Sequence, residues 1–263
     1  MNAASNAGIP VILSEWSSAS CGGIPGISDT FAATMWSLDY ALQLASVGYT
    51  GAFIHTREQG ITYNLFDPPA ANATSSNWTT NAPYYALLAA AEALKSDSEA
   101  SVLDFNLRET TVAGYTVFDS KSEAVNSLVL FNYADSPGPS VNFTVGTTTG
   151  QQALVRTLAA PSLREKHNIS WGGETLLGVG DGTMVKSGFA EDKLVSCGET
   201  CDIEVPSPGV AVVWLNASTA PAPTPTPTGT KNGGIRTFGS ASAHNQWEMY
   251  TGFLIGFMVF YFS

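Results

Sequence analysis

The feature that most constrains the fold of this chain is a change of hydrophobic period near residue 100. Before that point, short apolar runs alternate with stretches in which apolar residues recur every three or four positions. Between residues 101 and 215, apolar and polar residues alternate in short runs separated by Gly, Pro, Asp or Ser. The first pattern indicates strands joined by helices and the second indicates amphipathic strands, so we expect an α/β region followed by an all-β region.

Residues 1–97 contain two strand–helix units. The apolar run at residues 9–13 predicts a strand buried on both faces, and residues 49–55 predict a second strand. One face of the helix between them consists of Phe31, Met35, Leu38, Leu42 and Ala45. Pro83 suits the first turn of a second helix, which continues to about Lys95. Two such strands cannot close a barrel, so they need further neighbours.

Residues 98–216 predict an antiparallel β-sandwich. The strand-like runs are residues 102–107, 115–118, 128–131, 141–145, 153–158 and 210–215. Cys197 and Cys201 precede the last run, and their spacing permits a disulfide across a tight hairpin. That pairing leaves Cys21 as the odd cysteine of three, with a partner expected outside this chain.

Composition excludes several classes of function. The chain of 263 residues has 11 basic and 22 acidic side chains, a net charge of −11 that repels phosphate backbones, so we expect no nucleic-acid partner. The sequence has no C-x2-C pattern, and His55, His167 and His244 are too scattered for a zinc site. We therefore expect neither a metal nor a cofactor.

The carboxyl terminus predicts a surface anchor. Residues 217–248 form a stalk and spacer rich in Pro, Thr, Ser and Gly, and alternating prolines favour an extended, hydrated backbone. Residues 249–263 are an uncharged apolar tail, shorter than the ~20 residues of a spanning helix. Small residues and a polar spacer precede the tail, as in a glycosylphosphatidylinositol signal. The alternatives are a short membrane-spanning tail and a mistranslated end.

An anchored protein must enter the secretory pathway. Five N-x-[ST] sequons fit an extracellular, secreted protein: Asn72, Asn77, Asn142, Asn168 and Asn216. The first residues lack the basic and apolar segments of a signal peptide. We therefore expect this chain to be the carboxyl-terminal part of a longer protein.

Glu15 is the first candidate for chemistry. It lies two positions after the end of the apolar run at residues 9–13, and active sites of parallel α/β barrels lie at the carboxyl ends of the strands. A carboxylate there can act as a nucleophile or a general acid. The alternative is a solvated loop acid.

The segment around Glu15 resembles glycoside hydrolase family 79, the β-glucuronidase and heparanase-like enzymes. The residues that carry the resemblance are Ser14-Glu15-Trp16-Ser17-Ser18-Ala19, Gly22-Gly23, residues 26–33, Met35-Trp36-Ser37-Leu38-Asp39-Tyr40, Phe53-Ile54-His55, Tyr63-Asn64, Asp67-Pro68, Pro83-Tyr84-Tyr85, Ala91-Glu92-Ala93-Leu94, Leu158-Ala159-Ala160-Pro161 and Ile169-Ser170-Trp171-Gly172-Gly173. The resemblance covers residues 8–215. It implies that residues 1–97 are the last two βα units of a (β/α)8 barrel and that residues 98–216 are the family's β-sandwich.

The resemblance also implies a retaining mechanism on β-linked glucuronides of glycans, with Glu15 as nucleophile. The second carboxylic acid, about 5–5.5 Å from the nucleophile, lies in the family on an earlier barrel strand, outside this chain. We therefore expect the chain to be inactive alone. A second hypothesis is a non-catalytic, surface-anchored carbohydrate-binding or structural β-domain.

The family binds the glucuronate carboxylate through tyrosines and main-chain groups. Carried over, these are Cys21, Gly22 and Tyr63; Cys21 stands where some members have tyrosine, so only the main-chain role of Gly22 is independent of the side chain. His55 either lines the pocket or is structural, and Tyr63 is either a ligand or a core aromatic. Trp16 follows the nucleophile and is the candidate for stacking on a sugar ring.

Overall fold

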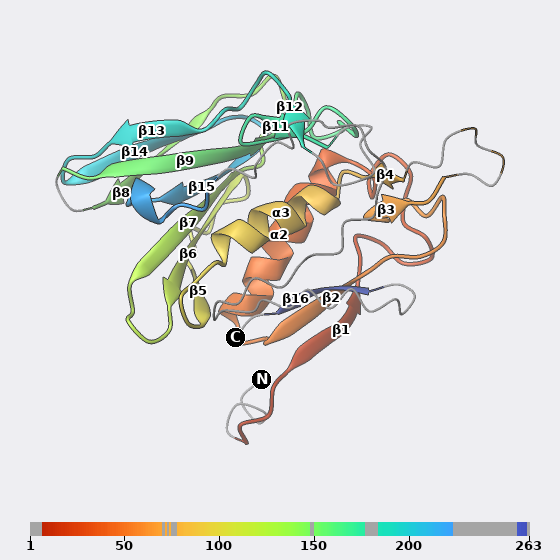
Figure 1. The fold of residues 1–263 in the computed structure, drawn as a ribbon, viewed down its shortest axis with the longest axis horizontal. Coiled ribbons are helices and arrows are strands. Elements are labelled where there is room, and N and C mark those ends of the chain that lie inside the picture. The colour runs from red at the N-terminus through yellow and green to blue at the C-terminus, as the bar shows by residue number, and fades with distance from the viewer. Residues whose placement is uncertain are drawn as a thin grey trace, which may run out of the picture.

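The computed structural model describes residues 7–69, 72, 74, 78–147, 150–176, 184–222 and 257–261. Two helices lie between a small sheet near the amino terminus and a large antiparallel sheet (Figure 1). The predicted change from an α/β to an all-β region is therefore confirmed.

The amino-terminal region has the predicted strand–helix order. Strand β1 (Ile12–Trp16) pairs in parallel with β2 (Gly51–His55), and helix α2 (Phe31–Ser46) connects them. After α2 the chain turns at Gly48, whose φ of +90° favours glycine. A short hairpin of β3 (Phe66–Asp67) and β4 (Thr79–Thr80) leads to helix α3 (Tyr84–Ala93).

Strand β1 is more exposed than the sequence predicted. Ile9 and Ile12 are 60% and 50% exposed, although the apolar run at residues 9–13 indicated a strand buried on both faces. In the described residues β1 pairs with β2 alone, so its second edge has no strand against it. The apolar pattern therefore reflects neighbours that a parallel strand requires and that the described residues do not provide.

The far edge of β2 carries one more strand. Strand β16 (Phe257–Tyr261) runs antiparallel to β2, with Phe257 opposite His55 and Tyr261 opposite Gly51. These residues belong to the predicted apolar tail, and the rest of the tail and most of the stalk lie outside the described residues. The helices of the described ranges are too short or too polar to cross a membrane.

The β domain consists of one large sheet and one small sheet. The large sheet has the order β12 (Val185–Lys186), β11 (Glu174–Thr175), β10 (Ser170–Trp171), β9 (Gln152–Ala159), β15 (Gly209–Trp214), β7 (Val125–Asn132), β6 (Val112–Asp119) and β5 (Ala100–Asp104), with β13 (Lys193–Ser196) also on β9. The small sheet pairs β14 (Thr200–Val205) with β8 (Val141–Gly146). A 3-10 turn, η1 (Ala217–Thr219), follows β15.

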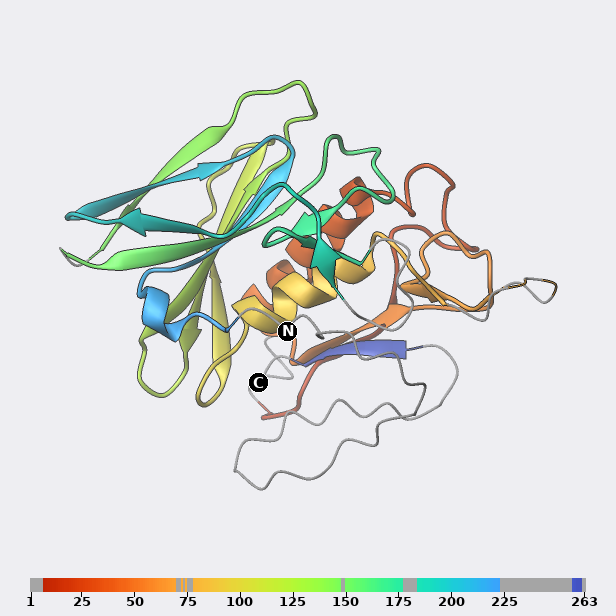
Figure 2. The same cartoon turned by 45° about the horizontal axis from the view of Figure 1, so that its top comes forward.

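Two apolar cores hold these layers together. The larger core joins α2, α3 and β2 to one face of the large sheet, and Phe31, Leu38 and Phe131 in it are fully buried. The smaller core lies between the other face of that sheet and β14–β8. Figure 2 shows the two helices against one face of the large sheet, with the β14–β8 pair on the opposite side of that sheet. The six predicted strands overlap β5 to β9 and β15, whereas the short strands β10 to β13 and the six-residue strand β14 were not predicted.

Buried polar contacts also join the helices to the β domain. Arg156 on β9 is 3% exposed and forms ion pairs with Glu92 on α3 and with Asp192. Its guanidinium lies 5.8 Å from the ring centre of Trp171 and 5.7 Å from that of Trp214. This arginine therefore ties α3 to β9 through charge and cation–π contacts.

A second polar contact joins α2 to the sheet. The Tyr115 hydroxyl on β6 donates a hydrogen bond of 2.6 Å to Asp39 on α2 and lies 3.2 Å from Oε1 of Gln43. Burial raises the pKa of the Asp39 carboxyl above its ordinary value, although the hydrogen bond from Tyr115 opposes that change.

Candidate active site

Glu15 and His55 lie near the carboxyl ends of two paired parallel strands. The Glu15 side chain, on β1, is 57% exposed, and that of His55, on β2, is 21% exposed. Oε1 of Glu15 is 3.1 Å from Nδ1 of His55. Because parallel strands place their carboxyl ends at the same edge, the strand pairing itself brings the two side chains together.

Tyr63 joins this pair from the loop that follows β2. Its hydroxyl lies 3.3 Å from Nδ1 of His55, and the two rings stack with centres 5.5 Å apart. Tyr63 is only 4% exposed, so its ring is packed against its neighbours, with His55 among them. The structure thus brings together three predicted site residues: Glu15, His55 and Tyr63.

The loop after β1 is fastened to the loop after β2. Thr62 donates two hydrogen bonds to the carbonyl of Gly22, from its main-chain N (3.0 Å) and its hydroxyl (2.7 Å). Gly23 has a φ of +81°, and a Cβ there would come within 2.3 Å of the Thr62 hydroxyl oxygen. Gly22 is therefore held beside the Tyr63 loop through its main chain, while Cys21 has an exposed free thiol.

A buried amide holds the loop that carries Tyr63. Asn64 is fully buried; its Oδ1 accepts hydrogen bonds from the Arg57 main-chain N and the Thr56 hydroxyl, and its Nδ2 donates to the Glu58 carbonyl and to Asp67. All four bonding positions of this side-chain amide are used. The sequence did not predict this role, although Tyr63-Asn64 is among the residues that carry the family resemblance.

Asp67 completes the same network. One of its oxygens accepts from Asn64 and the Gly60 main-chain N, and the other accepts from Asn81. Asn81 is a further residue that sequence reasoning missed, because a single asparagine before a helix carries no distinctive pattern. Asp67 therefore serves the loop structure, and Glu58 pairs with Arg57 at 3.0 Å.

The structure corrects the expectation that Trp16 stacks on a sugar. Trp16 is 6% exposed, and its ring packs on α2 against Trp36 and Tyr40, at 5.5 and 5.3 Å between ring centres. Glu15 lies beside His55 with an exposed side chain, whereas Trp16 is packed on α2, and the register of β1 with β2 shifts between Leu13 and Trp16. A ring buried against the helix has no face free for a ligand.

The remaining predicted residues lie away from Glu15 in the chain. Cys197 and Cys201 form a disulfide between β13 and β14, with their Cα atoms 4.7 Å apart. The sequon asparagines in the described residues are exposed and comprise Asn72, Asn142, Asn168 and Asn216. Asn77 lies outside the described residues, and glycosylation stays a prediction. Within the described ranges no three His, Cys, Asp or Glu side chains gather as a metal site would require.

Comparison with known proteins shows which families this chain is similar to. Residues 114–212 match the family model described as "Glycosyl hydrolase family 79 C-terminal beta domain". The chain is 27% identical over 230 residues to a beta-glucuronidase of Aspergillus niger, covering 79% of this chain and 42% of that protein. It is 36% identical over 85 residues to a beta-glucuronidase of Neurospora crassa, covering 32% and 15%.

Solved structures show the same fold. A 4-O-alpha-L-rhamnosyl-beta-D-glucuronidase from Fusarium oxysporum, solved with Rha-GlcA, superposes with a TM-score of 0.67 at 21% identity, over 81% of this chain and 45% of that one. A GH51 arabinofuranosidase from Xanthomonas axonopodis gives 0.52 at 12% identity, over 79% and 41%. The chain thus spans less than half the length of these relatives.

Proposed function

We propose that this chain, which carries the C-terminal beta domain of glycosyl hydrolase family 79 and is distantly related to beta-glucuronidases, is the carboxyl-terminal part of a retaining glycosidase that acts on β-linked glucuronides. The observation that carries the proposal is the exposed Glu15 carboxylate at the end of β1, 3.1 Å from His55 on the parallel strand. The relatives' names and the Rha-GlcA complex of the Fusarium enzyme support glucuronides as the substrate class.

In this proposal Glu15 is the nucleophile. Its carboxylate attacks the anomeric carbon and forms an ester, and water later releases the sugar with retained configuration. A second carboxylic acid must protonate the leaving oxygen. Glu58 is paired with Arg57 and Asp67 is bound within its loop, so neither is placed for that role. We therefore expect no turnover of glucuronides by this chain alone.

The chemistry of its two neighbours suggests which hydrogen bond His55 donates and which it cannot accept. In this proposal Nδ1 of His55 carries a proton and donates it to the Glu15 carboxylate, because an ionised carboxylate can only accept. The Tyr63 hydroxyl, 3.3 Å from the same nitrogen, then cannot donate to it. Its proton is left to donate to another acceptor, such as the substrate carboxylate. His55 in this proposal orients the nucleophile and Tyr63 binds the sugar acid.

Neutral donors suit this anionic substrate. The chain has 11 basic residues among 263, and Arg57 in the Tyr63 loop is already paired with Glu58. A tyrosine hydroxyl and main-chain N–H groups near Gly22 can hydrogen-bond a carboxylate without a nearby cation. The two hydrogen bonds from Thr62 to the Gly22 carbonyl hold these main-chain groups beside the loop that carries Tyr63.

The nucleophile can be tested in the chain as it stands, with 2-deoxy-2-fluoro-β-glucuronyl fluoride. Glu15 forms an ester to C1 while the C1–F bond breaks and fluoride leaves with both electrons, so the missing acid is not needed. We expect mass spectrometry to find one adduct on the peptide containing Glu15. Glu15→Gln should abolish it and the matched control Glu58→Gln should keep it. Absence of the adduct from the folded chain, or an adduct on another residue, would contradict the assignment.

We also propose that the mature protein is extracellular and held at the cell surface by a glycosylphosphatidylinositol anchor. The support is the sequence of the small residues, spacer and apolar tail over residues 232–263. Attachment would remove the tail, including β16, and leave the far edge of β2 without it. Mass spectrometry of the protein isolated from cells tests this, because a mature protein that retains residues 257–261 excludes the anchor.

A further inference from the structure

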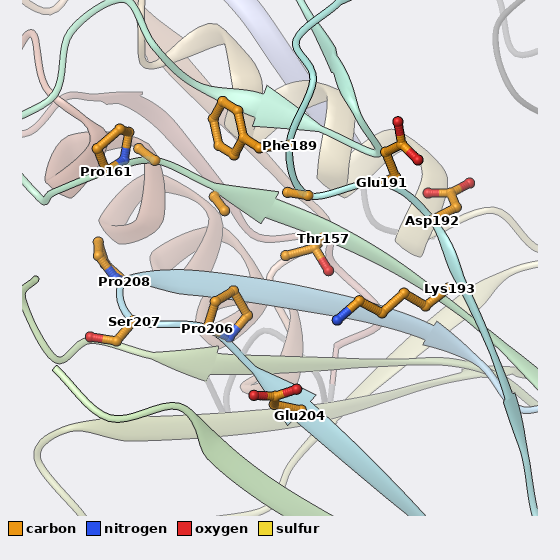
Figure 3. A pocket seen from close by; sticks show the side chains of 13 residues that line it. Thr157, Pro161, Phe189, Glu191, Asp192, Lys193, Glu204, Pro206, Ser207 and Pro208 are labelled. Carbon is orange, nitrogen blue, oxygen red and sulfur yellow. The ribbon is translucent and has the colours of Figure 1, made fainter. Parts of the chain in front are cut away.

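A cavity of about 530 Å³ lies in the β domain, among residues that take no part in the proposed active site. It lies over the end of β9 and between the chain leading into β13 and the turn from β14 to β15 (Figure 3). The lining residues comprise Thr157, Ala159, Ala160, Pro161, Phe189, Ala190, Glu191, Asp192, Lys193, Glu204, Pro206, Ser207 and Pro208. Its volume falls within the range typical of small-ligand sites, about 300–1,000 Å³.

The walls of the cavity are formed by the apolar rings of one phenylalanine and three prolines. In Figure 3 Phe189 and Pro206 stand on opposite sides, with Pro161 and Pro208 at one end. The floor is formed by small side chains of β9, Thr157 and Ala159. A slot between an aromatic ring and proline rings matches a flat ligand with apolar faces, as the C–H faces of a pyranose are.

The opposite end of the cavity is polar and carries both signs of charge. Figure 3 shows the ammonium of Lys193 pointing toward the middle and the carboxylate of Glu204 at the rim. Across the described part of the chain neither side chain has an ion-pair partner within 4.0 Å. Asp192 is different, because both of its oxygens bind the Arg156 guanidinium at 2.6–3.1 Å. Lys193 and Glu204 are thus one donor and one acceptor available to a ligand.

We propose that this cavity binds a neutral saccharide unit. A sugar hydroxyl both donates and accepts, so adjacent hydroxyls can satisfy Glu204 and Lys193 together while the ring packs between Phe189 and Pro206. A uronate is disfavoured because Glu191 and Glu204 add two carboxylates against the single ammonium of Lys193. The site is separate from Glu15, and it would hold uncharged parts of a glycan whichever way the nucleophile assignment falls.

The test is saccharide titration of the purified chain by NMR. The probes are xylobiose, galactobiose and cellobiose, with glucuronic acid as the charged comparison. We expect at least one neutral disaccharide, at about 10 mM, to shift the amide signals of residues 189–193 and 204–207. Phe189→Ala should weaken that binding about tenfold. Leu194→Ala is the control, because Leu194 neighbours Lys193 on β13 but is 62% exposed and does not line the cavity.

Two further variants separate a ligand site from a structural one. Glu204→Gln and Lys193→Met change exposed polar groups and should weaken saccharide binding severalfold without loss of the fold, whereas the exposed Glu199→Gln should leave binding unchanged. Glu15→Gln should also leave it unchanged, so failure of the active-site proposal is distinguishable. The inference is overturned if no neutral disaccharide shifts these signals, or if glucuronic acid binds there more tightly.

Discussion

The β1–β2 sheet and the β domain differ in how completely their strands are covered. All six residues of β15 are buried, because β15 lies between β7 and β9 and has a core on each face. On β1 only Trp16 is buried, and Ile12 is 50% exposed. Strand β1, which carries Glu15, is therefore stabilised less by its own packing than β15 is, since burial of apolar area is the main source of stability.

The region with the candidate chemistry is held in place by the region without it. Helix α3 is joined to the β domain through Arg156 and through Tyr85, whose hydroxyl accepts a hydrogen bond from the Leu176 main-chain N and contacts Thr175. Helix α2 is joined through Asp39. The β domain therefore supports the two helices, and disruption of its contacts with them should alter the Glu15 site.

The largest expected effect is that of Arg156→Ala. Removal of this side chain leaves Glu92 and Asp192 as partly buried carboxylates without their partner and opens space between Trp171 and Trp214. Loss of one partner of a buried charge cluster costs about 3–5 kcal/mol. Denaturant unfolding should show a loss of stability of this size, with the helices and the β domain no longer unfolding together.

Arg164→Ala is the matched control for that change. Arg164 also pairs with an aspartate, Asp135, at 2.9 Å, but its side chain is 82% exposed. Exposed ion pairs contribute about 0–1 kcal/mol. Equal losses for the two arginines would refute the claim that the buried cluster joins the two regions.

An intermediate effect is expected for Asn64→Ala, which acts within the less covered region. The change removes the bonds of Asn64 to the Thr56 hydroxyl, to the main chain of residues 57 and 58 and to Asp67, and it leaves buried groups without partners. Each such group costs about 1–3 kcal/mol. We expect proteolysis within residues 56–67 and slower labelling of Glu15 by the fluoride, while the β domain unfolds as before.

The control for that loop is Asn168→Ala, an exposed asparagine of the β domain. It should alter neither proteolysis nor labelling. If Asn64→Ala behaves in the same way, the amide network does not position Tyr63 beside His55, and the loop must be held by other contacts.

The β1–β2 sheet and the β domain differ in how much of their structure could be predicted from the sequence. Short apolar runs bounded by turn residues predicted β5 to β9 and β15, because strands that cover a core are rich in apolar residues whether one face or both faces are buried. The pairs β10–β11 and β11–β12 are two residues per strand, too short for any period to be visible.

In the site, the strand ends predicted Glu15 and His55, since parallel strands bring their carboxyl ends together wherever the partners lie in the sequence. The expected stacking of Trp16 on a sugar was based on its adjacency to Glu15 along the chain, whereas in the structure its ring is packed on α2. The Asn64–Asp67–Asn81 network depends on loop geometry, which has no period to record it.

The smallest expected effect concerns pH and the contact between α2 and the sheet. Burial raises the pKa of Asp39 above its ordinary 3.8, so the folded chain holds this proton more tightly than the unfolded chain does. The stability that Asp39 contributes is therefore complete below pH 3.8 and is lost as the pH rises through the higher folded value. Gln43, Tyr115, Tyr133 and Asp104 face this carboxyl, and the charge of Asp104 acts in the same direction as burial.

Asp39→Asn keeps an oxygen that accepts from Tyr115 but cannot ionise, so its stability should not show this loss. We expect the stability of Asp39→Asn relative to the unsubstituted chain to increase as the pH rises from about 4 to 7. This increase should be smaller than the loss of stability expected for Arg156→Ala or for Asn64→Ala. Denaturant unfolding across that range measures it, and the exposed Asp202→Asn, on β14, should show no such trend. Parallel pH profiles for Asp39→Asn and the unsubstituted chain would mean that the helix and sheet are joined by packing around Phe31 and Leu38 rather than by this carboxyl.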